Sequence, residues 1–178
     1  MKVVIVDDTK LNLTLLDHQV RKLPDCESIC FTEPIAALEW CLTNEPDLMV
    51  VDFNMPVMDG IELTKRFREH YPNIPVLMVT ANHDTKVRHD ALEIGVNDFL
   101  NKPLDNTEFK ARSKNMLDLR LHQKDLEQKV RARTKDLRMQ WSVSLSRNGR
   151  PFSAWPERLN IVTQKRVPIL CAWRIIQS

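Results

Sequence analysis

Short apolar runs alternate with longer amphipathic segments along the first hundred or so residues. The runs span Lys2–Val6, Ser28–Phe31, Leu48–Phe53, Pro75–Thr80 and Asn97–Asn101. Continuous apolar runs of this length are typical of strands that are buried on both faces. The segments between them carry apolar residues at helical spacing, as in Gly60–Tyr71, where Leu63 and Phe67 share one face. The pattern therefore predicts five successive β-α repeats.

Alternating strands and helices predict a parallel sheet with helices on both faces. The most apolar runs are expected at its centre: Val3–Val6, Leu48–Val51 and Val76–Val79. The crossovers should be right-handed. The pattern alone does not give the strand order. For a domain of this size we expect an α/β fold of the flavodoxin-like (βα)5 type, a doubly wound parallel sheet of order 2-1-3-4-5, with an extended C-terminal helix.

Caps and helix breakers mark the expected helix ends. Thr9 is placed to cap the first helix and Pro24 to stop it. The leucines of that helix occur at helical spacing: Leu11, Leu15, Leu16 and Leu23. Gly95 closes the fourth helix, and the last helix begins near Asp105.

The composition is ordinary for a soluble protein, with 43% hydrophobic and 28% charged residues among 178. No run of about 18 apolar residues is present, so we expect no membrane span. The first residues are too few and too quickly acidic to form a signal peptide. The four cysteines lack metal-site spacing: Cys26, Cys30, Cys41 and Cys171. We therefore expect reduced thiols and a cytoplasmic protein.

The net charge of +2 conceals two unlike parts. Residues 1–109 contain 10 Lys and Arg against 19 Asp and Glu, a net charge of −9. Residues 110–178 contain 16 against 5, a net charge of +11. This asymmetry predicts an acidic folded domain, followed by parts of a different kind. These are an extended helix over residues 110–140 and an irregular tail over residues 141–178.

Polar residues stand at the carboxyl ends of four predicted strands: Asp7 and Asp8, Asp52, Thr80 and Lys102. In an open parallel sheet these ends share the edge at which such sheets bind ligands. Clustered carboxylates raise one another's pKa, and a divalent cation such as Mg²⁺ relieves their repulsion. Asp52 is the central carboxylate, so we predict that it is the nucleophile and forms an aspartyl phosphate. Lys102 and Thr80 would contact the phosphoryl oxygens.

These motifs resemble the receiver domain of bacterial two-component response regulators. The resemblance covers about residues 1–120 and rests on Asp7-Asp8, Asp52 with Met55-Pro56 and Asp59-Gly60, Thr80-Ala81 and Lys102-Pro103. It implies that a sensor histidine kinase or a phosphotransfer protein phosphorylates Asp52. It also implies a Mg²⁺ site formed by Asp8, Asp52 and the backbone carbonyl of Asn54, on which Asp7 acts mainly through water. The Lys102–Pro103 bond is expected to be cis.

Phe99 occupies the position of the family's switch aromatic residue, which is often Tyr. The resemblance implies that Thr80 moves toward the phosphoryl group and that Phe99 fills the space it leaves. The face formed by the fourth helix, the fifth strand and the fifth helix would then change. Phe99 has no hydroxyl and cannot form the hydrogen bond that Tyr could. Simple packing is its alternative role.

The last predicted helix continues well past the receiver, because no Pro or Gly occurs from Phe109 to Gln140. A heptad can be written with a positions at Phe109, Met116, Gln123, Val130 and Leu137. Only about half of the a and d positions are apolar, which indicates a weak coiled coil. We expect a homodimer through residues 109–140, and a solvated single helix is the alternative. We expect no nucleic-acid partner, since acidic residues interleave with the basic ones.

The periodicity is lost after Met139. A shifted frame joins the third base of each codon to the first two bases of the next codon. Read in this frame with permitted codons, Trp155 to Val167 can encode ARAAEYRDTETG, which resembles the opening of an HD-GYP domain, a cyclic-di-GMP phosphodiesterase output. We hypothesise that residues from about 141–148 onward form an out-of-frame tail in place of that domain. A genuine short tail is the alternative. No His-Asp pair and no Gly-Tyr-Pro follow residue 140, so phosphodiesterase activity is not expected here.

The sequence therefore predicts a phosphorylation-dependent switch rather than an enzyme that turns over an external substrate. One alternative is a phosphatase with an Asp nucleophile on a similar sheet. Haloacid-dehalogenase-like phosphatases place two Asp residues two positions apart after the first strand, whereas Asp7 and Asp8 are adjacent. A second alternative is a DNA-binding regulator, which needs an output domain that the tail does not provide.

Overall fold

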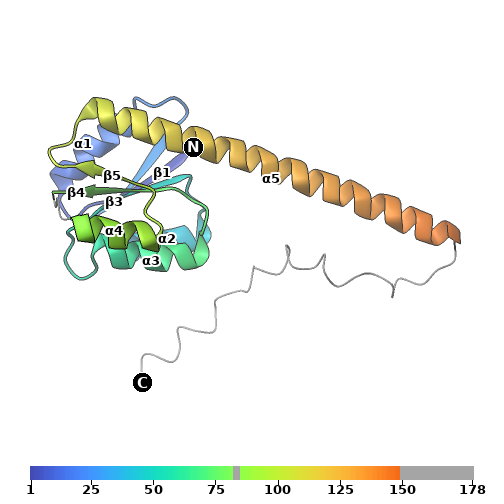
Figure 1. Ribbon diagram of the computed structural model, residues 1–178. Coiled ribbons are helices and arrows are strands. Elements are labelled where there is room, and N and C mark those ends of the chain that lie inside the picture. Colours follow the sequence, from blue (N-terminus) through green and yellow to red (C-terminus); the bar gives the residue numbers. More distant parts are fainter. Residues whose placement is uncertain (82–84, 149–178) are drawn as a thin grey trace, which may run out of the picture. The chain divides into compact units, whose positions relative to one another are not determined.

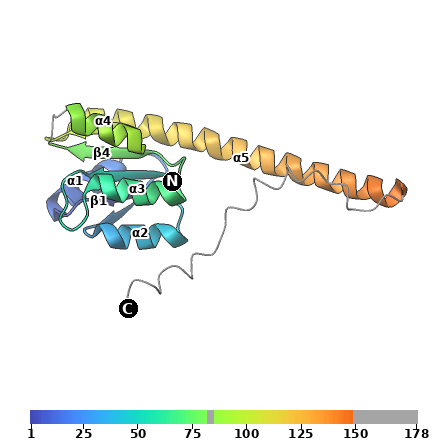
Figure 2. The same cartoon turned by 60° about the horizontal axis from the view of Figure 1, so that its bottom comes forward.

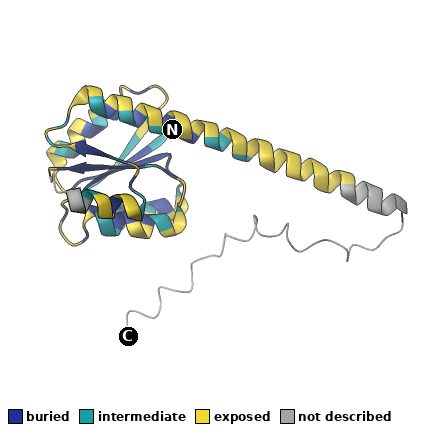
Figure 3. Cartoon of the chain, viewed as in Figure 1, coloured by how far each residue is buried: buried dark blue, intermediate teal, exposed yellow. Residues whose placement is uncertain are grey.

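The computed structural model describes residues 1–81 and 85–148. Its sheet consists of five parallel strands (Figure 1), namely β1 (Lys2–Val6), β2 (Glu27–Phe31), β3 (Leu48–Asp52), β4 (Val76–Thr80) and β5 (Asp98–Asn101). The strand order is β2-β1-β3-β4-β5, which confirms the predicted flavodoxin-like topology. The three most apolar runs are the three central strands, and every residue of β3 and β4 is buried (Figure 3).

Helices cover both faces of the sheet, and their bounds are α1 (Lys10–Val20), α2 (Pro34–Thr43), α3 (Gly60–His70), α4 (Thr85–Ile94) and α5 (Asn106–Asn148). Figures 1 and 2 show α1 and the first part of α5 on one face, and α2, α3 and α4 on the other. Alternate residues of a strand point to opposite faces. Val3 and Ile5 therefore belong to the core under α1 and α5, while Val4 and Val6 belong to the core under α2 and α3.

The ends of α1 differ from the sequence signals in two ways. Thr9 occupies the N-cap position, but its side chain forms no cap hydrogen bond. The helix ends at Val20, well before Pro24. Elsewhere, Asp105 accepts hydrogen bonds from the first backbone amides of α5, and Gly95 follows α4 with a φ of 106°.

Two leucines of α1 are exposed, although their helical spacing suggested that they belong to the apolar face of the helix. Leu11 is 67% exposed and Leu15 is 51% exposed. The buried stripe of α1 consists instead of Leu13, Leu16 and Val20, which lie three and seven positions apart and so share one helix face. The remaining leucines point away from the sheet.

The helix α5 is longer than the sequence predicted. It contains 43 residues and ends at Asn148, beyond the expected boundary at residue 140. No Gly or Pro occurs between Asn106 and Asn148, so α5 contains no residue that would break it earlier. The rest of the predicted tail, residues 149–178, lies outside the described residues. Among the described helices, α5 included, none has the length and hydropathy that a bilayer crossing requires.

Candidate functional site

Residues from four strand ends meet at one edge of the sheet. Asp7 follows β1, Asp52 ends β3, Thr80 ends β4 and Lys102 follows β5. Asp7, Asp52 and Thr80 are each at most 4% exposed, while Asp8 is exposed. The parallel topology produces this convergence, because all the strands run in the same direction and end on the same side.

Three carboxylates in this group are close enough to hold a single cation. Ligand oxygens of Asp7, Asp8 and Asp52 all lie within 4.8 Å of one another. Oxygens on opposite sides of a Mg²⁺ ion are about 4 Å apart, because each bond is about 2.1 Å long. The donor set therefore fits a hard divalent cation. Asn54, the predicted carbonyl ligand, lies in the loop that follows β3.

Lys102 bridges two of these carboxylates. Its Nζ atom lies 2.7 Å from Asp52 Oδ1 and 3.4 Å from Asp7 Oδ2. Burial by itself would lower the pKa of Lys102, but its hydrogen bonds with Asp52 and Asp7 and their negative charges outweigh burial and raise that pKa. The ammonium is therefore held in its charged form beside the nucleophile candidate.

The pKa of Asp52 is also raised. Burial is the main cause, and the charges of Asp7 and Asp8 add to it, while Lys102 opposes both. An ionised Asp52 is therefore destabilised by its surroundings when no cation is bound. A metal ion that neutralises this charge would relieve that cost.

Asn12 orients Asp7, and it is not among the site residues predicted from the sequence. Its Nδ2 atom lies 3.0 Å from both carboxylate oxygens of Asp7, and the backbone amide of Thr9 donates to Asp7 Oδ1 at 2.9 Å. The only sequence signal for this role is weak: Asn12 is a polar residue on the first turn of the helix that follows Asp7-Asp8. These contacts restrict the Asp7 carboxylate to one orientation.

The loop between β3 and α3 is tightly constrained beside Asp52. A Cβ atom on Gly60 would lie 2.5 Å from the backbone oxygen of Asp52, so only glycine fits there. Asp59 caps α3 by accepting a hydrogen bond from the backbone amide of Glu62 at 2.8 Å. Val57 has a φ of 71° and is 88% exposed. A β-branched residue is strained in this left-handed conformation.

The remaining predicted residues lie on β4, on β5 and after β5. The backbone oxygen of Thr80 accepts a hydrogen bond from the Lys102 amide at 2.9 Å, and the Lys102–Pro103 bond is cis, as expected.

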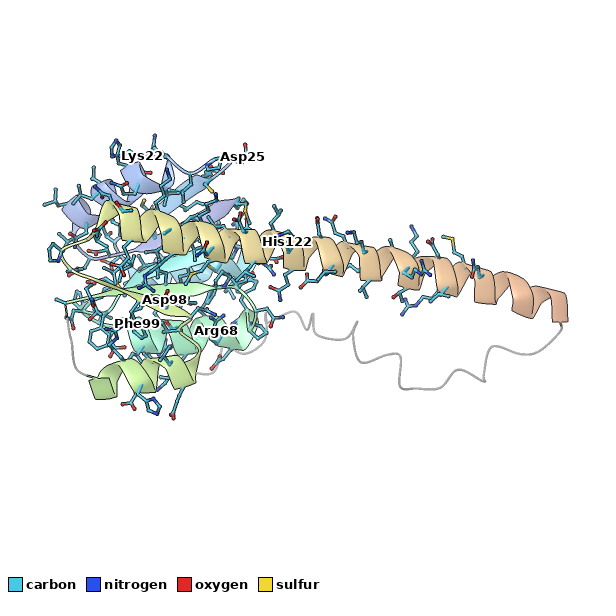
Figure 4. All side chains as sticks on the ribbon, turned by 45° about the horizontal axis from the view of Figure 1, so that its top comes forward. Lys22, Asp25, Arg68, Asp98, Phe99 and His122 are labelled. Atoms are coloured by element: carbon cyan, nitrogen blue, oxygen red, sulfur yellow. The ribbon has the colours of Figure 1, made fainter. Side chains whose placement is uncertain are left out.

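Phe99 is 5% exposed, and the guanidinium of Arg88 lies 4.9 Å from the centre of its ring. Its neighbour Asp98 pairs with Arg112 of α5. Figure 4 shows Asp98 and Phe99 together on β5.

The geometry agrees with a family comparison, in which residues 3–114 match the response regulator receiver domain. The chain belongs to this family. Receiver domains are phosphoacceptor domains of phosphorylation-dependent signal transduction, and this chain carries such a domain. The solved receiver domain of the Francisella response regulator 1452 is similar to it, with a TM-score of 0.61 and 28% identity over 66% of this chain and 96% of that one.

Two curated relatives extend the comparison. The cyclic di-GMP phosphodiesterase response regulator RpfG of Xanthomonas campestris is 37% identical over 133 residues, which are 73% of this chain and 35% of RpfG. The alkaline phosphatase synthesis transcriptional regulatory protein PhoP of Bacillus subtilis is 34% identical over 65% of this chain and 48% of PhoP. This chain thus spans between a third and a half of the length of these relatives.

Proposed function

We propose that Asp52 is the phosphoacceptor of this receiver and that a sensor histidine kinase or a phosphotransfer protein is its donor. A carboxylate oxygen of Asp52 attacks the phosphorus of a phosphohistidine, a P–O bond forms, and the P–N bond breaks. The imidazole nitrogen leaves with the electron pair of that bond. The product is an aspartyl phosphate.

The contacts of the three carboxylates support Asp52 over its neighbours. Asp7 accepts hydrogen bonds from Asn12 and Thr9, which hold its carboxylate in place. Asp8 is exposed and accepts a hydrogen bond from Thr9 Oγ1 at 3.2 Å. The ammonium of Lys102, at the end of a flexible side chain, lies 2.7 Å from Asp52 Oδ1. This distance is the main support for the proposal. The ammonium can transfer its contact from the carboxylate to an incoming phosphoryl oxygen.

The metal that fits the site is Mg²⁺, which would be held by Asp8, Asp52 and the carbonyl of Asn54, with Asp7 acting through water. Bound there, it would neutralise charge on the phosphoryl oxygens during transfer. The Thr80 hydroxyl and Lys102 would bind the oxygens afterwards. Movement of Thr80, followed by Phe99, would alter the face formed by α4, β5 and α5.

The test is phosphorylation by acetyl phosphate with Mg²⁺, followed by intact mass. The wild-type chain should gain one phosphoryl group, and Asp52→Asn should gain none. Asp59→Asn is the matched control, because asparagine also caps helices well, and it should be labelled like the wild type. Labelling of Asp52→Asn at a single site would refute the assignment.

We further propose that α5 pairs with a second copy of the chain. Leu119 and Leu126 are 70% and 62% exposed, and Val130 and Leu137 continue the same heptad at 60% and 52% exposed. Phe109, the first a position of the expected seam, is 1% exposed in the receiver core and is unavailable to a partner. The proposed parallel homodimer therefore begins at Leu119.

The likeness to RpfG supports an HD-GYP origin for this receiver, and we propose that its output domain has been replaced by an out-of-frame tail. Sequencing of the coding DNA tests this, because the shifted frame must encode the HD-GYP-like string.

We also propose a cytoplasmic location, which the free thiols of Cys26, Cys30 and Cys41 support. The phosphatase and DNA-binding alternatives gain no support from the site.

A further inference from the structure

The contact between α5 and the receiver changes in character after Leu117. Phe109 and Leu117 are buried among apolar residues of the core. The next residues on the same helix face, at spacings of three and four, are Arg120, Lys124 and Glu127. The side chain of Arg120 is only 3% exposed. A charged side chain buried this deeply needs partners, because desolvation of an unpaired charge is strongly unfavourable.

Arg120 finds its partners on both sides. Its Nη2 atom pairs with Glu45 Oε1, in the loop between α2 and β3. Its Nη1 atom lies 3.9 Å from Glu127 Oε1, two turns further along α5. The loop and the helix are therefore linked by one buried guanidinium, across 75 positions of sequence.

Asp47 forms a second link a turn further along. It is 4% exposed and pairs with Lys124 of α5 through Oδ1. Its other carboxylate oxygen accepts a hydrogen bond from the backbone amide of Lys2 at 2.8 Å, and its own amide donates to the Lys2 carbonyl at 2.7 Å. Asp47 therefore connects the beginnings of β1 and β3 with the linker helix.

We propose that Glu45, Asp47, Arg120 and Lys124 form an ionic clamp that fixes where α5 leaves the receiver. Apolar contacts tolerate sliding and rotation, whereas paired charges with few alternative partners specify one register. The compact unit that contains the receiver ends at Gln128, just after the clamp. With the clamp closed, Leu119 and Leu126 stay exposed and available to a partner. His122, labelled in Figure 4, lies on α5 between Arg120 and Lys124.

The clamp lies at the ends of β1 and β3 opposite to the phosphorylation site. Each of these strands is five residues long, and at the other end Asp7 follows β1 and Asp52 ends β3. The clamp itself requires no phosphorylation. It involves only residues of the receiver and of α5, and it stands or falls separately from the assignment of Asp52.

Hydrogen exchange of the full-length chain, read by mass spectrometry, tests the clamp. Lys124→Met and Asp47→Asn should each raise the exchange rate of amides 118–128 by roughly tenfold or more, because local opening of these turns becomes easier. Amides of β3 and β4 should keep their protection. Lys114→Met, at an exposed position of the same helix, is the matched control and should change nothing in this segment.

A double variant separates a clamp from two independent effects. Asp47→Asn with Lys124→Met should exchange no faster in this segment than the more affected single variant, because the pair is broken only once. Acceptance of phosphate from acetyl phosphate checks that the variants are folded. Of the two single variants, Lys124→Met should perturb the fold less, because the Lys124 side chain is 35% exposed and that of Asp47 is 6% exposed. Wild-type exchange of amides 118–128 in both single variants would overturn the proposal. Fully additive effects would also overturn it.

Discussion

The ammonium of Lys102 lies 2.7 Å from Asp52 Oδ1 and 3.4 Å from Asp7 Oδ2. One flexible cation thus contacts carboxylates at the ends of two adjacent strands, and both of those carboxylates are buried. The contact lowers the electrostatic cost of burying these carboxylates when the site contains neither metal nor phosphate. It also places the positive charge where the phosphoryl oxygens would arrive.

Lys102→Met should destabilise the metal-free protein by about 2 kcal/mol, because it leaves two buried carboxylates without their shared counterion. Denaturant unfolding in EDTA measures this loss, and Mg²⁺ should recover most of it. Lys110→Met, at an exposed position of α5, is the control and should cost almost nothing. Equal stability of Lys102→Met and the wild type in EDTA would contradict the electrostatic role.

The raised pKa of Asp52 predicts a pH dependence of stability. The folded protein binds this proton more tightly than the unfolded chain, in which the pKa is about 4. The free energy of unfolding without metal should therefore fall as the pH rises from about 4 through the folded pKa. Asp52→Asn should lack this part of the decline and be the more stable protein at neutral pH in EDTA. A difference between the two proteins that stays constant with pH would count against it.

Asn12→Ala should weaken Mg²⁺ binding about tenfold, since residues that orient metal ligands commonly contribute this much. The reason is that Asp7 loses the amide that contacts both of its oxygens. Calorimetric titration of the metal-free chain with Mg²⁺ measures the affinity directly. Thr14→Ala, an exposed change on the same helix, should leave the affinity unchanged.

Val57→Asn should stabilise the protein by about 1 kcal/mol, because asparagine tolerates the left-handed conformation that costs other residues about that much. Val57→Ala should give a smaller gain, since alanine removes the branched side chain but keeps the backbone cost. Thermal unfolding compares the three proteins. A loss of stability in Val57→Asn would show that the exposed valine is held by contacts of its own.

Leu126→Glu should shift the proposed dimer toward monomer, because a carboxylate would replace an apolar contact on the paired face. Leu121→Glu is the matched control. Leu121 is also on α5 and is 50% exposed, but it lies on the outer face of the heptad. Light scattering of the full-length chain over a range of concentrations, with and without beryllofluoride, measures the effect. A monomeric wild type under every condition would exclude the dimer.

The alternation of apolar runs and amphipathic segments was sufficient to predict five β-α units, the three central strands and the sheet edge that carries Asp52. These features depend on period and polarity along the chain, which are local properties. The long helix was also predictable, because only Gly and Pro would have interrupted it. Its end at Asn148 lies beyond the predicted residue 140, because apolar periodicity is lost after Met139 while the helical backbone continues.

Only the tertiary structure decided which face of each helix is buried and which distant residues meet. Leu11 and Leu15 have the same residue type as Leu16, and rotation of α1 against the sheet separates exposed from buried leucines. Likewise, Asn12 reaches Asp7 and Arg120 reaches Glu45 only when the elements are packed. Such contacts depend on helix orientation and on segments far apart in the chain, and these are set by packing of the whole domain rather than by local pattern.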